Sequence, residues 1–183
     1  MIRKTERFEK TIPAKEFTKR YVDIPKFLKY CEQCEYYGKN WACPPFDFDP
    51  MDVWNSYDSI TLVMERLSFD RDSTKEDVEK ELWEERQKLQ DKLIECEKEY
   101  PAATALSAGN CKLCAKGTCA RLSGEPCRFP DRMRHSIESL GGDVGMVLED
   151  LFDEPLTWVS GDEVPLTLRL CLGILTRGEK SEE

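Results

Sequence analysis

Residues 59–69, with the sequence SITLVMERLSF, decide the fold class of this chain of 183 residues. Their β-branched and apolar centre, Ile60 to Met64, is typical of a buried strand. A long helix is expected next, because Ser73 and Glu76 match a capping box and apolar residues recur at helical spacing until Pro101. These apolar positions are Val78, Leu82, Leu89, Leu93, Cys96 and Tyr100. The opposite, highly charged face is most simply a solvated surface.

Shorter elements are expected on both sides of this strand and helix. The expected strands are Phe8–Ile12, Thr104–Ala108 and Leu166–Leu175. The expected helices are one capped by Asp23 and those over residues 51–57, 132–140 and 144–152. Residues 14–22 could form either a short helix or a strand. This alternation predicts an α/β or α+β domain with a single mixed sheet flanked by helices. We expect one domain over residues 1–177 and a disordered tail at 178–183.

The charge and the apolar pattern argue against several classes of protein. The net charge of −9 disfavours a general binder of nucleic acid or anionic membranes. No run approaches the roughly 18 apolar residues of a membrane span, and no apolar stretch of a signal peptide follows the first residues. We therefore expect a cytoplasmic protein. Thiols stay reduced there, so clustered cysteines indicate metal or redox sites rather than disulfides.

Seven of the nine cysteines fall into two groups with metal-ligand spacing, and the second group is complete. It consists of Cys111, Cys114, Cys119 and Cys127. The spacing of two residues lets the first pair aim both thiolates at one point, and the later two close the shell. The irregular later spacing, with a proline soon after the last ligand, favours a [4Fe–4S] cluster. A zinc ion and free or redox-active thiols stay open as alternatives.

Basic residues surround this second group. Lys112, Lys116, Arg121, Arg128, Arg132 and Arg134 stand against Glu125 and Asp131, a local excess of +4 in an acidic chain. A centre with four thiolates carries a charge of about −2 for zinc or an iron–sulfur cluster. We therefore expect the basic residues to compensate the charge of the centre.

The first group supplies three thiols, from Cys31, Cys34 and Cys43. Its neighbourhood is acidic and aromatic, with Tyr36, Tyr37, Trp41, Phe46 and Phe48 in the same loop. Three interpretations stay open. The group could hold its own cluster with one iron open to a substrate or another ligand, bind zinc with a fourth ligand from elsewhere, or form a metal-free structural loop.

Three further residues could act as ligands or catalytic groups, but a simpler structural role is expected for each. Cys96 on the apolar helix face and Cys171 within the last strand are expected in the core, and Cys171 is the better spare ligand for the first group. His135, the single histidine, is expected to be a surface or cap residue at the start of a helix.

Three stretches together resemble one protein family. They are Cys31-x2-Cys34-x-Tyr36-Tyr37-Gly38-x2-Trp41-x-Cys43-Pro44-Pro45, then Ala108-Gly109-x-Cys111-x2-Cys114, then Cys127-Arg128-Phe129-Pro130 leading to residues 136–144. This order is similar to a family of small bacterial and archaeal predicted metal-binding proteins, a domain of unknown function (DUF2284-like). The family pattern has Ser-Met-Glu-Ala before Gly-Ile-Asp-Val, so Ile137, Ser139 and Gly142 depart from it. The resemblance implies metal or iron–sulfur binding through the seven cysteines, without an assigned reaction.

These observations predict a metal-binding protein that carries a [4Fe–4S] cluster on the second cysteine group. A second centre on the first group is a further possibility. The leading function is that of an electron-transfer accessory to a cytoplasmic redox protein. The alternatives are a structural zinc protein that braces an interaction surface, and an enzyme that uses an open iron at the three-cysteine group.

Overall fold

The computed structural model describes residues 2–100, 102–157 and 164–178. Its centre is one four-stranded sheet with the order β1-β2-β4-β3. The strands are β1 (Ile2–Pro13), β2 (Ser59–Phe69), β3 (Thr104–Leu106) and β4 (Thr167–Thr176). The expected single sheet with flanking helices is confirmed as an α+β fold. The pairings between the four strands are all antiparallel, so the sheet is not mixed.

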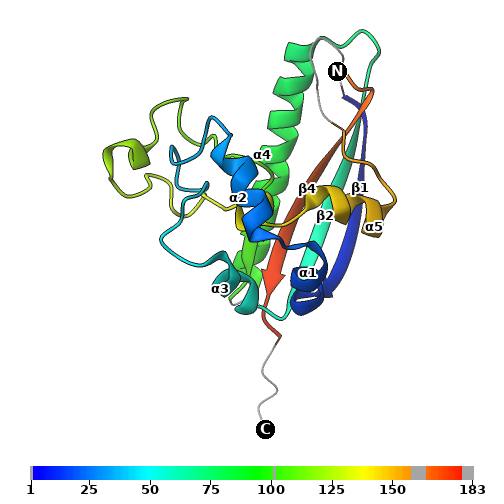
Figure 1. Cartoon of the computed structure of the whole chain (residues 1–183). Coiled ribbons are helices and arrows are strands. Elements are labelled where there is room, and N and C mark those ends of the chain that lie inside the picture. Colours follow the sequence, from blue (N-terminus) through cyan, green and yellow to red (C-terminus); the bar gives the residue numbers. More distant parts are fainter. Residues whose placement is uncertain (1, 101, 158–163, 179–183) are drawn as a thin grey trace.

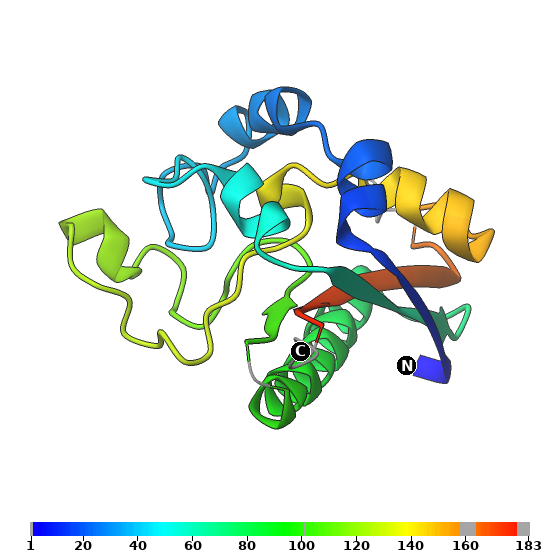
Figure 2. The same ribbon diagram turned by 90° about the horizontal axis from the view of Figure 1, so that it is seen from below.

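The helices form layers on both faces of this sheet (Figures 1 and 2). One face is covered by α4 (Lys75–Glu99). The other carries α1 (Ala14–Tyr21), α2 (Ile24–Glu32), α3 (Pro50–Asn55) and α5 (Val144–Phe152). Two short 3-10 turns, η1 (Ala120–Ser123) and η2 (Glu138–Leu140), lie in the long connection between β3 and α5. The described residues contain no helix long and apolar enough to cross a membrane.

The central strand β2 packs alternate side chains on opposite faces, as its sequence predicts. Leu62 and Met64 lie in the core cluster that contains Trp54 of α3. Val63 and Leu67 lie in the second cluster, beneath α4. Burial of apolar surface stabilises a fold by about 25 cal/mol per Å². Because β2 buries apolar side chains on both faces of the sheet, it contributes to both core clusters.

Several element boundaries differ from those expected. Within the open segment 14–22, residues 14–21 form α1 and Val22 is extended, and β1 begins well before Phe8. The capping box of α4 lies one residue later than expected, at Thr74 and Asp77, whose side chains each accept the backbone N–H of the other at 3.2 Å. The expected tail at 178–183 lies outside the described residues except for Gly178, whose N–H donates to Asp58 Oδ2 at 2.7 Å.

The prediction of a helix over residues 132–140 is wrong. The chain instead forms a bridge between Ser107 and Ser136 and then the short turn η2. Here the Ser136 and Ser139 hydroxyls each accept the backbone N–H of the other residue, at 3.1 and 3.0 Å. Such local side-chain bonds compete with helical backbone bonds, which explains why the apolar pattern does not continue as an α-helix.

The short strand β3 decides where the functional loops begin. It pairs with residues 173–175 of β4, and then the chain leaves the sheet. The segment 167–172 of β4 therefore pairs with β2 along one edge and with no other described strand along its second edge, and the connection after β3 carries the second cysteine group. In Figures 1 and 2 this connection and the loop after α2 extend side by side from the same end of the molecule.

The turn after η2 is tightly packed around two glycines. Gly141 has a φ of +90°, and a Cβ placed on it would lie 2.6 Å from Ile24 Cγ1. A Cβ on Gly142 would lie 2.4 Å from Ile137 Cγ2. Ile137 and Gly142, two of the three departures from the family pattern, therefore lie against each other, because the β-branched isoleucine occupies the space that a side chain at 142 would need.

We predict that Gly142→Ala lowers the free energy of unfolding by about 1–3 kcal/mol through overpacking. Combining it with Ile137→Met should recover part of this loss, because an unbranched side chain can move away from the new methyl group. Urea unfolding of the two single variants and the double variant measures the coupling. Strictly additive losses would show that the two positions do not compensate each other.

Candidate metal centre

The two cysteine groups lie on two irregular segments. The first cysteine loop, residues 31–49, starts in the last turn of α2 and ends at Asp49, which caps α3 by accepting the N–H of Met51. The second cysteine loop, residues 107–137, joins β3 to η2 and contains η1. Because neither segment has much regular structure of its own, contacts between the two loops determine where the thiols lie.

Arg121 makes the strongest of these contacts. It lies in η1, two residues after Cys119, and its guanidinium donates to three carbonyl groups of the first cysteine loop. Nη1 donates to the carbonyls of Asn40 at 2.7 Å and Cys43 at 2.5 Å, and Nη2 donates to the carbonyl of Pro45. Hydrogen bonds from charged donors stabilise by about 1.5–3 kcal/mol each. This one side chain therefore fastens the backbone around Cys43 to the second loop.

Other contacts reinforce the junction between the loops. Trp41 Nε1 donates to the carbonyl of Glu125 at 3.0 Å, and its ring lies 5.3 Å from the Arg121 guanidinium. Lys116 and Glu35 form an ion pair at 2.9 Å, which is exposed and contributes little.

His135 differs from its expected role as a surface or cap residue. It is half-buried, its Nδ1 lies 3.3 Å from the carbonyl of Ala42, and its ring packs edge-on against Phe46 and Phe48. Burial lowers the pKa of His135. The neutral ring is therefore a structural support for the first cysteine loop.

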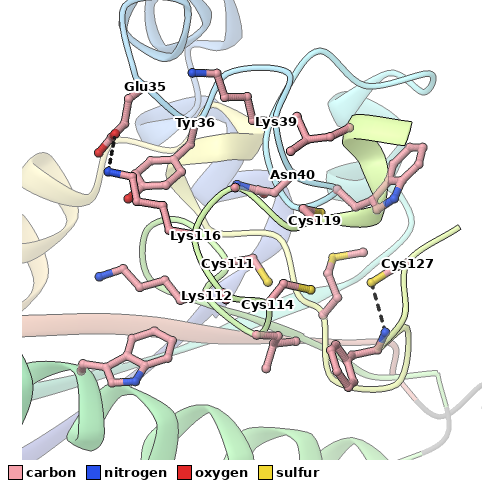
Figure 3. Close-up of a pocket in the computed structure, with 18 residues that line it drawn as sticks. Glu35, Tyr36, Lys39, Asn40, Cys111, Lys112, Cys114, Lys116, Cys119 and Cys127 are labelled. Atoms are coloured by element: carbon pink, nitrogen blue, oxygen red, sulfur yellow. Dashed lines mark hydrogen bonds and ion pairs between the residues drawn. The ribbon is translucent and has the colours of Figure 1, made fainter. Parts of the chain in front are cut away.

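The four thiols of the second group surround one cavity of about 600 Å³ (Figure 3). Figure 3 shows Cys111 and Cys114 next to each other, with Cys119 and Cys127 around them. Tyr36, Asn40 and Trp41 of the first loop form another wall of the same cavity. The structure therefore brings together all four members of the second group and encloses them with side chains from the first loop.

The first group lies beside this cavity. Burial is the main reason why the pKa of Cys43 rises to about 11; Asn40 opposes the rise through a hydrogen bond, and charge at Cys34, Cys31 and Cys111 adds to it. Burial also raises the pKa of Cys31, with smaller effects of Cys34 and Glu138. The effect of Cys111 on the pKa of Cys43 places these two thiols within electrostatic reach of each other. The two groups therefore form one thiol-rich region.

The donors fit a thiol-bound metal centre by their chemistry. Thiolates are the preferred ligands of zinc and of iron–sulfur clusters, and the four thiols of the second group are partly accessible. As the side chains stand, however, no group of three or more Cys, His, Asp or Glu within residues 2–100, 102–157 and 164–178 is placed to hold a single metal ion.

The basic residues of the second loop contact carboxylates, carbonyl groups and an aromatic ring. Arg132 pairs with Asp91 at 3.1 Å, and Arg134 binds Glu97 with its Nε at 2.7 Å. Arg121, Lys116 and Arg128 make the contacts between or within the loops. Lys112 lines the cavity beside the Trp83 ring. Hydrogen bonds to carbonyl groups leave the charge of Arg121 and Arg128 in place, so compensation of the charge of a metal centre stays a prediction.

Two buried charged residues near the centre were not expected from the sequence. Arg86 of α4 is 8% exposed, and a carboxyl oxygen of Glu138 in η2 is buried. The burial of Arg86 could have been predicted from the sequence. Arg86 comes four residues after Leu82 and three before Leu89, which places it on the apolar side of the helix. Of the two ungrouped cysteines, Cys171 is in the core as expected, whereas Cys96 is partly exposed.

The fold and the site together define a cysteine-rich α+β protein with a candidate metal centre between two interlocked loops. The chain belongs to the family of predicted metal-binding proteins DUF2284, whose model matches residues 18–171. This match includes all seven grouped cysteines and confirms the resemblance drawn from the three sequence stretches. Comparison with curated proteins gave no match, and comparison with solved structures gave none either.

We predict that Arg121→Met loosens the first cysteine loop while the sheet stays folded. Amide hydrogen exchange of residues 38–46 should become about tenfold faster or more, because three charge-assisted bonds are lost. Arg128→Met is the matched control, since Arg128 Nη1 donates to the carbonyl of Thr118 within its own loop. Equal exchange in both variants would show that Arg121 does not hold the loops together.

Proposed function

We propose that this protein carries a [4Fe–4S] cluster on Cys111, Cys114, Cys119 and Cys127 and acts as an electron-transfer accessory. The observation that carries this proposal is the shared cavity of about 600 Å³ with these four thiols in its walls. A cube of four irons and four sulfides holds its thiolates farther apart than a single ion does, so it suits a cavity that one zinc ion would leave largely empty.

The walls of the cavity support the same function. When bound, such a cluster supplies one-electron redox chemistry. Tyr36, Trp41 and Trp83 line the cavity and limit the access of water. Leu122 and Phe129 also line it and are 52% and 42% exposed. Exposed apolar side chains beside the centre suit the transient docking of a redox protein partner.

We propose the three-cysteine group, Cys31, Cys34 and Cys43, as a second metal site next to the first. This second proposal is supported by the effect of Cys111 on the pKa of Cys43, which places the two thiols within electrostatic reach of each other. In two-cluster ferredoxins a cysteine of one motif likewise serves the neighbouring cluster.

Purification without oxygen tests the main centre. We expect a broad visible absorption band and at least about four iron and four sulfide per chain. Cys119→Ser should abolish the band of this centre, whereas Cys96→Ser should keep it, because Cys96 lies on α4 outside both cysteine loops. Colourless protein with about one or two zinc ions would instead support the structural zinc alternative and contradict the cluster.

Cys43→Ser tests whether the two groups are separate. We predict that this variant keeps about four iron per chain on the second group, since the four ligands of that group are unchanged. Iron and sulfide analysis of the same preparation measures this. Loss of all iron would show that Cys43 is a ligand of the main centre and that our assignment of the second group is wrong.

A further inference from the structure

The strand β1 forms an open edge at one border of the sheet (Figure 1). It pairs with β2 along one side, and no other described strand lies along its second side. Residues 4–13 keep one register with β2, and the pairing shifts between Ile2 and Lys4. From Thr5 to Thr11 the side chains are exposed, apart from the half-buried Glu6. A long, regular edge of this kind presents unpaired backbone N–H and C=O groups to another strand.

The charges of β1 determine which strand this edge can accept, because charged side chains on an edge usually prevent pairing. The charged residues of its regular part are Lys4, Glu6, Arg7, Glu9 and Lys10. Glu9 and Lys10 are exposed and form no ion pair within residues 2–100, 102–157 and 164–178. Two adjacent charges of opposite sign are therefore available to a partner strand.

A second copy of β1 can pair with this edge in only a few registers. In an antiparallel pair, residues opposite each other turn their backbone N–H and C=O groups either both toward the partner strand or both away from it. These groups alternate along a strand, so each symmetric register places one residue opposite itself, on the twofold axis. A charged residue on the axis would face the same charge, which destabilises the pair. This argument excludes Lys4, Glu6, Arg7, Glu9 and Lys10 as axis residues.

The uncharged residues of the regular part leave one favourable register. Thr5 on the axis would place Arg3 opposite Arg7, which is another pair of like charges. An axis at Thr11 would pair only residues 9–13 of each strand, because β1 ends at Pro13. An axis at Phe8 avoids both faults and pairs residues 4–12 of one copy with residues 4–12 of the other.

With Phe8 on the axis, the charges of the two strands complement each other. Arg7 faces Glu9 of the second copy, Glu6 faces Lys10, and the symmetry repeats both pairs. Cross-strand pairs of opposite charge stabilise a sheet. The Phe8 side chain is 39% exposed, and in this register it meets its counterpart across the axis. The contact therefore buries apolar surface at its centre and surrounds it with ion pairs.

These ion pairs extend rows of charge that already cross the strands of one chain. Arg7 lies opposite Glu65 of β2, with Nη2 at 2.5 Å from Oε1, and Glu6 lies opposite Arg66, at 2.9 Å. Residues opposite each other point to the same face of a sheet, so the second copy adds the next side chain to each row. Because this side chain has the opposite charge in both rows, the sign alternates across the interface.

We propose that β1 is an interface between two copies of this chain, which pair antiparallel about Phe8 and join their sheets into one. Backbone hydrogen bonds along residues 4–12 hold the two strands together, and the pairs of Arg7 with Glu9 and of Glu6 with Lys10 fix the register. No described residue of β1 lines the cysteine cavity, so this interface is separate from the proposed metal centre.

Sedimentation velocity of the full chain between about 1 and 300 µM tests the association. We expect a species of twice the chain mass of 21.2 kDa that increases with concentration. Glu9→Lys should raise the dissociation constant about tenfold or more, because it places a lysine opposite Arg7 at two points. The matched control is Glu99→Lys, the same change at an exposed residue that ends α4, near β3 at the opposite border of the sheet.

A chain that stays monomeric over this range would overturn the proposal. A dimer that Glu9→Lys and Glu99→Lys weaken equally would also overturn it, because the copies would then meet at another surface. Neither result depends on which metal the protein holds, so a failure of the cluster proposal leaves this test intact.

Disulfide trapping tests the register. Opposite residues of paired strands have Cα atoms about 4.5–5.5 Å apart, within the range of disulfides. Phe8→Cys should therefore form a linked dimer under mild oxidation. Thr5→Cys and Thr11→Cys should each fail to link with themselves but should link with each other when the two variants are mixed. Mass spectrometry of the linked peptides distinguishes these bonds from those of the native cysteines. Absence of the link at position 8, or a link of Thr5→Cys with itself, would overturn this register.

Discussion

The hydrogen bonds from Arg121 to the carbonyl groups of Asn40, Cys43 and Pro45 are the contact on which the rest of the site depends. The cysteines lie largely on irregular loops, which have few backbone bonds of their own to define where a thiol points. A planar guanidinium that reaches three carbonyls fixes both distance and orientation between the loops. Trp41 and His135 support the same junction from two sides. The thiol-rich region is therefore a product of long-range contacts as much as of cysteine spacing.

The sheet determines how this region relates to the rest of the molecule. Because β3 is short, the chain leaves β4 early, and the same departure starts the second cysteine loop and leaves a cavity along the strand. The helix α4 crosses behind both cavities and contributes Trp83 to each of them.

Local patterns predicted part of this structure well. The bounds of β2 and α5 agree with the expected residues, because alternating apolar residues in β2 and the Asp143 cap of α5, which accepts the N–H of Met146, are strong local signals. The two cysteine groups were also evident from spacing. The structure of residues 132–140 was not evident from the sequence, because hydrogen bonds of the Ser136 and Ser139 side chains replace helical backbone bonds. The half-buried position of His135 depends on distant partners, so the sequence alone placed this histidine at the surface. The burial of Arg86 was missed although its spacing from Leu82 and Leu89 puts it on the apolar side of α4.

The central claim is that Cys111, Cys114, Cys119 and Cys127 hold a cluster of several irons in their common cavity. X-ray absorption at the metal edge of protein prepared without oxygen tests it most directly, because the fine structure reports both the ligand atoms and any neighbouring metal. The account predicts iron surrounded by sulfur with a clear iron–iron contribution. A zinc edge with one shell of ligands at about 2.3 Å and no metal neighbour would contradict it.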